Sequence, residues 1–313
     1  PNAQHHGKTT KFISLKGSFH GRTEKPSQIS DSCLDKYKRY LASFQNLDNL
    51  RLVTPNDCDG LRKAFDEAKE QNIFYEAMFI EPVMGEGNPG EAITPEFYNL
   101  ARKLTLEHGS LLVVDSVQAG FRAQGCLSIV DYPGFENVVP PDIETYSKAI
   151  NSGQYPLSVA ALSSRVADLY VPSIYGNTMT TNPKALEVAC HVLSSITPEL
   201  RNNIIEKGKE FVTKLKNVQK DFPDVVTDVK GCGLLCSISF REDNAKYKVV
   251  APLGIERRMR INGIGVIHGG ENALRFTPHF GISSQEIVLI TEVLKKVLKE
   301  LDIKEGLTIA DFG

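Results

Sequence analysis

The sequence predicts an α/β protein with a large, mostly parallel sheet domain and a small C-terminal α/β domain. Two apolar runs, Ala77–Ile80 and Leu111–Asp115, end at a carboxylate, as strands buried on both faces of a sheet do. Stretches with apolar residues at helical spacing, Asp57–Gln71 and Pro95–His108, alternate with these runs. Strands that alternate with helices in this way are typical of parallel sheets with crossover helices.

A chain of 313 residues is long enough for a large core and for two domains. We expect a large domain over residues 1–197 and a small domain over residues 198–313. A helix at Asn182–Ile196, capped by Asn182, lies at the boundary between them. The small domain is predicted to alternate helices and strands, at residues 198–222, 233–240, 256–262, 265–268, 273–276 and 283–301.

Composition and charge exclude several classes of protein. A formal net charge of -2 provides no basic field for nucleic acid or anionic lipid, and no apolar run approaches the roughly 20 residues that a membrane helix requires. The six cysteines are scattered and mostly in apolar contexts, which predicts reduced thiols, no disulfide framework and no metal site. We therefore expect a soluble, cytoplasmic protein. A mitochondrial location stays open, because the chain begins at Pro1 and its native start is not visible.

The stretch from Asp142 to Ser158 organises the predicted site. It is a short strand that runs into Lys148 and then into a turn with glycine and proline. A lysine at the carboxyl end of a buried strand lies where open α/β sheets place their ligand crevice. Partial desolvation there lowers the pKa of an amine toward that of a usable nucleophile. The strand that ends in Asp115 delivers a carboxylate to the same edge of the sheet.

An amine and a carboxylate in this arrangement suit pyridoxal 5'-phosphate (PLP). The aldehyde of PLP forms an imine with a lysine, and its pyridine nitrogen keeps a proton when a carboxylate faces it. The simpler alternatives are a solvated loop lysine for Lys148 and a helix N-cap for Asp115.

Six motifs in register resemble those of class III (omega-amino acid type) aminotransferases of PLP-dependent fold type I. They span nearly the whole chain, and ornithine, acetylornithine and 4-aminobutyrate aminotransferases share them. The resemblance implies a large PLP-binding sheet domain, a small C-terminal domain and transaminase activity. The motifs are Ser18–Thr23, Glu81–Gly87, Asp115–Gly120, Ser147–Lys148, Asn177–Thr178 ahead of Asn182–Pro183, and Arg275–Pro278.

The resemblance also implies roles around the cofactor. Lys148 is expected to form a Schiff base with PLP and to carry protons, and Asp115 to keep the pyridine nitrogen protonated. Phe19 resembles the residue whose ring stacks on the cofactor, with His20 as a hydrogen-bonded neighbour. Gln118 resembles the residue that contacts the phenolic oxygen of PLP.

Four further residues are implied to bind phosphate or substrate. Thr178 matches a threonine that reaches the cofactor phosphate of the neighbouring subunit, which implies a homodimer with shared active sites. Arg22 and Arg275 resemble arginines that hold substrate carboxylates, Arg275 that of glutamate or 2-oxoglutarate. Glu86 resembles the acid that pairs with Arg275 when a substrate lacks that carboxylate. A structural role, for Arg22 a salt bridge, is the alternative for each arginine.

The chain also departs from the family pattern. Ser116 and Ala119 stand where a glutamate and a threonine are usual, which we interpret as changes that retune specificity. Relatives carry a further N-terminal portion, with a Gly/Ser-rich loop that cradles the cofactor phosphate. No such loop occurs in this sequence, so we expect this portion to precede it in a longer polypeptide. The alternative is a shortened relative that cannot hold PLP well.

The expected function is a PLP-dependent transaminase. It moves an amino group from an omega-amino acid or diamine, of the ornithine, acetylornithine, 4-aminobutyrate or lysine type, to 2-oxoglutarate. One alternative is a PLP-dependent aminomutase or decarboxylase, which keeps Lys148 and Asp115 but needs no second keto acid. Another is a non-catalytic, aminotransferase-like protein that acts in dimerisation or regulation. The sequence does not identify the amino donor.

Overall fold

The computed structural model describes residues 2–45, 47–172 and 176–303, which form two compact units. Two short segments from the first half of the chain belong to the second unit. Residues 304–313 of the predicted small domain lie outside the described residues. The first unit contains Pro1–Asn88, Ala92–Phe121 and Cys126–Thr197, and the second Pro89–Glu91, Arg122–Gly125 and Pro198–Gly313.

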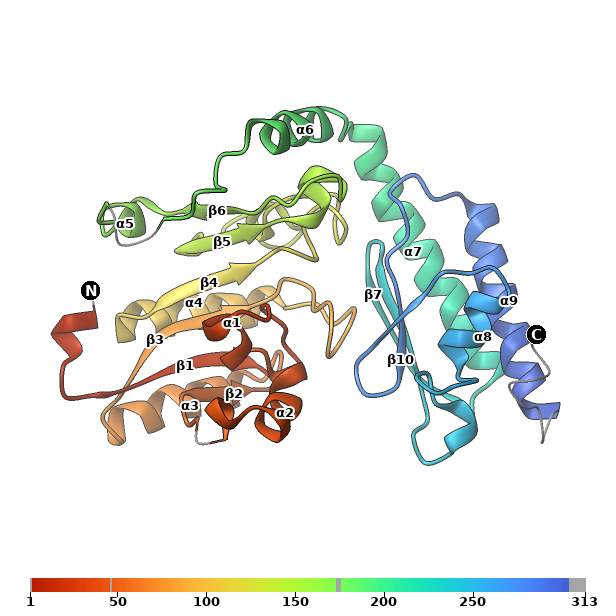
Figure 1. Cartoon of the computed structure of the whole chain (residues 1–313), viewed down its shortest axis with the longest axis horizontal. Coiled ribbons are helices and arrows are strands. Elements are labelled where there is room, and N and C mark those ends of the chain that lie inside the picture. Colours follow the sequence, from red (N-terminus) through yellow and green to blue (C-terminus); the bar gives the residue numbers. More distant parts are fainter. Residues whose placement is uncertain (1, 46, 173–175, 304–313) are drawn as a thin grey trace. The chain divides into compact units, whose positions relative to one another are not determined.

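A six-stranded sheet forms the centre of the first unit (Figure 1). Its strand order is β2-β1-β3-β4-β5-β6, and all neighbours run parallel except β5 and β6, which are antiparallel. The prediction of a mostly parallel sheet is therefore confirmed. The strands are β1 (Thr9–Leu15), β2 (Leu50–Val53), β3 (Ile73–Ile80), β4 (Leu111–Asp115), β5 (Ile143–Tyr146) and β6 (Val159–Leu162).

Helices α3 (Cys58–Glu70) and α4 (Pro95–His108) pack side by side against the central strands of this sheet. The side chain of Asp57 accepts a hydrogen bond from the first turn of α3, and that of Thr94 does so for α4. Both helices match the predicted ones. The other helical segments of this unit are η1 (Asn2–His5), α1 (Glu24–Gln28), α2 (Asp31–Tyr40), η2 (Ala42–Phe44), η3 (Ile129–Asp131), η4 (Lys148–Asn151), α5 (Ser164–Ala167) and α6 (Pro183–Ser194).

A buried carboxylate ties the start of β5 to its surroundings. Asp142 is fully buried, and Arg102 of α4 donates to it from both terminal nitrogens, at 2.7 and 3.2 Å. Arg165 Nε lies 3.3 Å from the same carboxylate, and Leu112 N donates to it at 2.9 Å. Two guanidinium groups and a backbone amide therefore compensate for the burial of this charge.

The second unit is built on a four-stranded antiparallel sheet of order β7-β8-β10-β9. Helices α7 and α9 pack against one another, and α7 covers one face of this sheet. Their apolar faces join alternate strand residues such as Ile238, Leu274 and Phe276 in one core. The elements are α7 (Pro198–Asp221), β7 (Val226–Cys232), β8 (Leu235–Phe240), η5 (Ala245–Tyr247), α8 (Ile255–Ile261), β9 (Ile267–Gly269), β10 (Ala273–Phe276) and α9 (Ser284–Ile303).

The two short segments of the second unit contact β7, β8 and the turn that joins them. Ser237 Oγ donates to Pro89 O at 2.6 Å, and a side chain at Gly233 would lie 1.8 Å from Ala123 O. Gly233 also has a positive φ of 57°, so only glycine fits the turn between β7 and β8. This close approach explains why segments distant in sequence belong to the unit.

Four elements were not expected from the sequence in the form that the structure shows. Residues Glu24–Thr54 are mostly polar, but they contain α1 and the edge strand β2, which is only four residues long. Strand β7 was not anticipated, because its Thr, Asp, Lys and Gly residues obscure the alternation of a strand. The strand expected from Gly233 begins at Leu235, since Gly233 and Leu234 form the hairpin turn.

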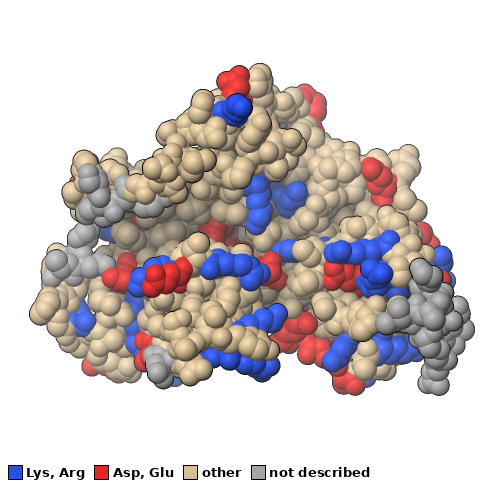
Figure 2. All heavy atoms as spheres, viewed as in Figure 1, with Lys and Arg blue, Asp and Glu red and all other residues tan. Residues whose placement is uncertain are grey.

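The surface carries charges of both signs. Figure 2 shows acidic side chains interspersed among the lysines and arginines on one face. Among the described residues, no helix combines the length and the apolar character that crossing a membrane requires.

Candidate active site

The carboxyl ends of β4 and β5 lie side by side in the sheet. The two strands run parallel, with Asp115 paired to Thr145. Lys148 follows Thr145 closely in sequence, which limits its separation from Asp115 along the strand to about 10 Å. The structure thus confirms that neighbouring parallel strands deliver an amine and a carboxylate to one edge of the sheet.

Lys148 begins the turn η4 in a left-handed backbone conformation, with a φ of 44°. Such a conformation costs a residue other than glycine about 1 to 3 kcal/mol, so the surrounding structure has to enforce it. Ser147 contributes by donating to Leu157 O at 2.6 Å. Lys148 is exposed, as are Ser152–Pro156 and β6 beside it. The desolvation expected from sequence is therefore absent in the single chain.

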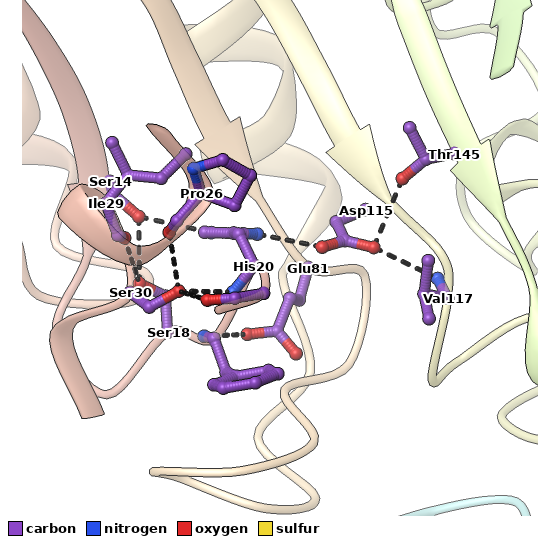
Figure 3. Close-up of polar contacts among 12 residues, drawn as sticks. Ser14, Ser18, His20, Pro26, Ile29, Ser30, Glu81, Asp115, Val117 and Thr145 are labelled. Atoms are coloured by element: carbon purple, nitrogen blue, oxygen red, sulfur yellow. Dashed lines mark hydrogen bonds and ion pairs between the residues drawn. The ribbon is translucent and has the colours of Figure 1, made fainter. Parts of the chain in front are cut away.

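Asp115 is held by three hydrogen bonds (Figure 3). Oδ2 lies 2.9 Å from His20 Nδ1, while Oδ1 accepts from Val117 N at 3.1 Å and from Thr145 Oγ1 at 3.2 Å. Burial raises the pKa of Asp115, but the hydrogen bonds, led by that from His20, outweigh burial and lower the pKa below its ordinary value. Asp115 is therefore a stable anion that can keep a proton on a facing ring nitrogen.

His20 is fixed from its other side by serines. Its side chain is 3% exposed, and Nε2 lies 3.2 Å from Ser14 Oγ. Ser14 Oγ is in turn 2.8 Å from Ser18 Oγ, and the backbone N–H of His20 donates to Ser30 Oγ at 2.8 Å. Because the Asp115 carboxylate accepts, Nδ1 carries the proton in this pair. Figure 3 shows the imidazole of His20 between Ser14 and Asp115.

Glu81 belongs to the same cluster, although the sequence analysis gave it no role. It follows β3 and is 2% exposed. Its Oε1 accepts from Phe19 N at 3.0 Å, and its Oε2 from Gly85 N at 2.9 Å. Burial raises the pKa of Glu81 to about 7, an effect that His20 opposes and Asp115 reinforces. The signal that could have identified Glu81 was the one used for Asp115, a buried strand that ends at a carboxylate.

Gln118 packs directly on the backbone of Gly85. A side-chain carbon at position 85 would lie 2.5 Å from Gln118 Cδ, so any residue other than glycine there would force the end of the Gln118 side chain to move. Gly87 has a similar constraint, because a carbon there would lie 2.4 Å from Gly17 O. Gly87 N donates to that oxygen at 3.1 Å. The segments that carry Phe19 and Gln118 therefore both pack against the segment Gly85–Gly87, and its glycines allow the close approach.

Phe19 and Arg22 contact each other. The guanidinium carbon of Arg22 lies 5.3 Å from the centroid of the Phe19 ring, and Nη1 donates to the Tyr37 hydroxyl at 3.3 Å. Arg22 is exposed and, among the described residues, makes no ion pair. A structural salt bridge therefore does not explain Arg22.

Ser116, one of the two departures from the family pattern, has a structural partner. Its Oγ donates to Glu144 Oε1 at 2.5 Å, while Ser128 Oγ donates to Oε2 at 2.6 Å. Ile129 N also donates to Oε1, at 3.1 Å. Glu144 is buried on β5, so Ser116 helps to compensate for its charge beside Asp115. Ala119, the second departure, is fully buried.

The remaining predicted residues lie outside this cluster or in the second unit. Glu86 is half-buried in the first unit, and Thr178 is exposed in the segment before α6. Arg275 is 7% exposed on β10 of the second unit. It lines a pocket of about 350 Å³ there, together with Arg260, Phe276 and other residues of the same unit.

Known proteins with similar sequences and structures point to one family. The family Aminotransferase class-III matches residues 2–298. The chain is 30% identical to the mitochondrial acetylornithine aminotransferase of Yarrowia lipolytica, over 93% of this chain and 64% of that protein. It is also 30% identical to ornithine aminotransferase 2 of Staphylococcus aureus, over 92% and 67% of the two chains. A structure of ornithine aminotransferase from Toxoplasma gondii superposes with a TM-score of 0.77 at 25% identity, over 95% and 66%.

The chain belongs to the class-III aminotransferase family. Fold type I follows from this membership and from the sheets described above. The chain spans 64% of the length of its Yarrowia lipolytica relative.

The residues present fit one end of PLP, the cofactor of the class-III family. Asp115 is an anion with a lowered pKa, as a pyridine nitrogen requires, and Lys148 supplies a primary amine at the same sheet edge. Another ornithine aminotransferase structure from Toxoplasma gondii is described as having partial occupancy of PLP at its active site. Asp115 therefore fits the pyridine nitrogen of PLP, and Lys148 fits its aldehyde.

Proposed function

We propose that this chain is a PLP-dependent transaminase that moves an amino group from an omega-amino acid or diamine to 2-oxoglutarate. The observation that carries the proposal is the pairing of β4 with β5, which brings an ionised Asp115 and the amine of Lys148 to one sheet edge. The ornithine and acetylornithine aminotransferases among its relatives support a donor of that type.

The cofactor end of the site is arranged to hold a flat, protonated ring. PLP, when bound, supplies an aldehyde for amines and a ring that withdraws electrons from the adjacent carbon. Asp115 keeps the proton on the ring nitrogen, and His20 keeps Asp115 in position through its 2.9 Å contact. Phe19 supplies an aromatic face, and Gln118 contacts the phenolic oxygen.

Lys148 provides both the nucleophile and the proton carrier. If PLP were bound, the Nζ of Lys148 would be the amine that holds its aldehyde in the absence of substrate. The same Nζ would be available as the base that takes a proton from the substrate carbon and as the acid that returns it. Arg22 and Arg275 hold substrate carboxylates through their planar guanidinium groups.

The proposal includes a homodimer in which Thr178 binds the cofactor phosphate of the other subunit. Several large apolar side chains are exposed between residues 148 and 172. A second copy that covers them would also remove water from Lys148. The exposed fractions are 43% for Val159, 44% for Leu162, 44% for Leu169, 56% for Tyr170 and 53% for Val171.

The test is an absorption spectrum of the purified protein with PLP, recorded before and after the addition of ornithine, acetylornithine or 4-aminobutyrate. We expect a visible band that shifts with the donor, and turnover that requires 2-oxoglutarate. Turnover without a keto acid would instead identify an aminomutase or decarboxylase. The absence of any band at saturating PLP would contradict the proposal.

A further inference from the structure

Glu81 connects two segments that face the proposed cofactor. One carboxylate oxygen accepts the backbone N–H of Phe19 at 3.0 Å, and the other accepts that of Gly85 at 2.9 Å. Each oxygen therefore fixes the direction of a different peptide group. Figure 3 shows Glu81 in the cluster with His20 and Asp115. The carboxylate is 2% exposed, so water does not compete for these hydrogen bonds.

Each of these two peptide groups lies next to a side chain of the proposed site. The N–H of Phe19 lies at the root of the aromatic ring that is proposed to cover the cofactor. Gly85 lies against Gln118, with only 2.5 Å between the position of a missing side-chain carbon and Gln118 Cδ. A rotation of the Phe19 peptide would displace its aromatic ring, and a rotation of the Gly85 peptide would displace the Gln118 amide, by a distance comparable to the length of a hydrogen bond.

The two segments also meet without Glu81. Gly87 N donates to Gly17 O at 3.1 Å, and Gly17 N donates to Asp31 at 2.7 Å. Loss of the Glu81 contacts would therefore leave the segments together but remove the hydrogen bonds that Glu81 accepts from the Phe19 and Gly85 N–H groups. This separates a positioning role from a purely structural one.

The charged groups that face Glu81 are His20, from the segment after β1, and Asp115, at the end of β4. His20 contacts Asp115 directly and lies near Glu81, so two carboxylates share the neighbourhood of one imidazole. An ionised carboxylate accepts both N–H groups, whereas a protonated one has a single strong acceptor oxygen. The state of Glu81 therefore decides whether both peptides are held.

We propose that Glu81 is a positioning residue for the cofactor, and that the site binds PLP tightly only when Glu81 is ionised. This inference rests on the proposed function for its ligand. The geometry behind the inference is independent of the proposed function, because Glu81 accepts the two N–H groups in the protein without a ligand.

Two opposite pH trends follow. Burial raises the pKa of Glu81 from 4.5 to about 7 in the folded protein. The contribution of Glu81 to folding stability is therefore complete below pH 4.5 and is lost as the pH rises through about 7. PLP affinity changes in the other direction, and rises as Glu81 ionises near pH 7.

The experiment compares the protein with its Glu81→Gln variant between pH 5.5 and 8.5. The dissociation constant for PLP is measured by absorbance titration, and hydrogen exchange of peptides that cover residues 17–22 and 83–88 is measured without PLP. For the unmodified protein we expect the affinity for PLP to rise about tenfold across this range. A tenfold change corresponds to a shift of about one unit in the pKa of Glu81 when PLP binds. The variant should bind weakly at every pH, lose that rise and exchange faster in both peptides.

A matched control is Glu144→Gln, which alters another buried carboxylate of the same unit. It should lower the melting temperature but retain the rise in affinity. The same rise in Glu81→Gln as in the unmodified protein, or unchanged exchange, would overturn the inference. If no form binds PLP but the exchange responds to Glu81 and to pH, the geometry of the inference holds and the proposed function fails.

Discussion

Two regions of the first unit differ in how completely one chain forms them. The ring-facing region (residues 17–22, 81–88 and 115–118) contains the buried Glu81 together with Asp115 and His20, whose side chains are 12% and 3% exposed, and all three are hydrogen-bonded. The exposed region (residues 148–172 and 176–182) contains Lys148 and Thr178, and both are exposed. One chain therefore organises the groups that we propose to hold the cofactor ring, whereas it leaves exposed the residues that we propose to bind the aldehyde and the phosphate.

The largest effect is expected from Lys148→Ala, which removes the primary amine that the exposed region supplies. Turnover should fall by about 10⁴-fold or more, because nucleophile and proton carrier are lost together. Reduction with borohydride followed by peptide mass analysis should detect PLP on the unmodified peptide and none on the variant. Lys148→Arg is the control for charge and should be equally inactive; turnover near the original level in either variant would exclude Lys148.

A large but smaller effect is expected from Asp115→Asn in the ring-facing region. The amide cannot keep a positive ring nitrogen, so turnover should drop by roughly 100-fold or more. His20→Ala should lower turnover less, because it removes the partner that orients Asp115 and not the acid itself. Steady-state kinetics of both variants against the same donor test this order, and the reverse order would contradict it.

An intermediate effect is expected from charges placed on the exposed region. The double variant Val159→Asp and Leu162→Asp should convert the proposed dimer into monomers in sedimentation, since it places two charges on the exposed apolar surface that we propose as the interface. PLP retention should fall in the same variant. Val250→Asp, at a site that is 64% exposed in the second unit, is the control and should stay dimeric. A dimer that survives the double variant uses another surface.

The smallest effect is expected from Ser116→Ala. The change leaves the buried Glu144 with one donor fewer, which should cost about 1 to 3 kcal/mol of unfolding free energy. Urea denaturation measures the cost, and Ser152→Ala at an exposed turn is the control. A large change in donor preference without a loss of stability would show that Ser116 acts on substrate, as the sequence analysis suggested.

Strand reasoning predicted the outline of the site from sequence. An apolar run that ends in Asp115 and a short strand that leads into Lys148 were predicted to be parallel neighbours, and the parallel pairing of β4 with β5 confirms that arrangement of the strands. The same pattern ends in Glu81, but the hydrogen bonds to Phe19 and Gly85 depend on how separate loops fold back. Sequence spacing carries no signal for such contacts.

Other features required three-dimensional information for different reasons. His20 and Asp115 are 95 positions apart, and nothing local to either indicates the pair. β6 runs antiparallel to β5, because a short turn after Lys148 reverses the chain where a crossover helix would have kept it parallel. The exposure of Lys148 depends on whether another chain covers the exposed region. The residues near Lys148 in sequence do not indicate this.

The contact between Gly85 and Gln118 has a consequence for how this site can evolve. The two positions share one volume, with 2.5 Å left where a side chain at position 85 would begin. An alanine at position 85 therefore requires either that the end of the Gln118 side chain turns away from Gly85 or that position 118 carries a shorter residue. The two positions should therefore covary, and a combinatorial library at 85 and 118 should recover compatible pairs far more often than independent single substitutions.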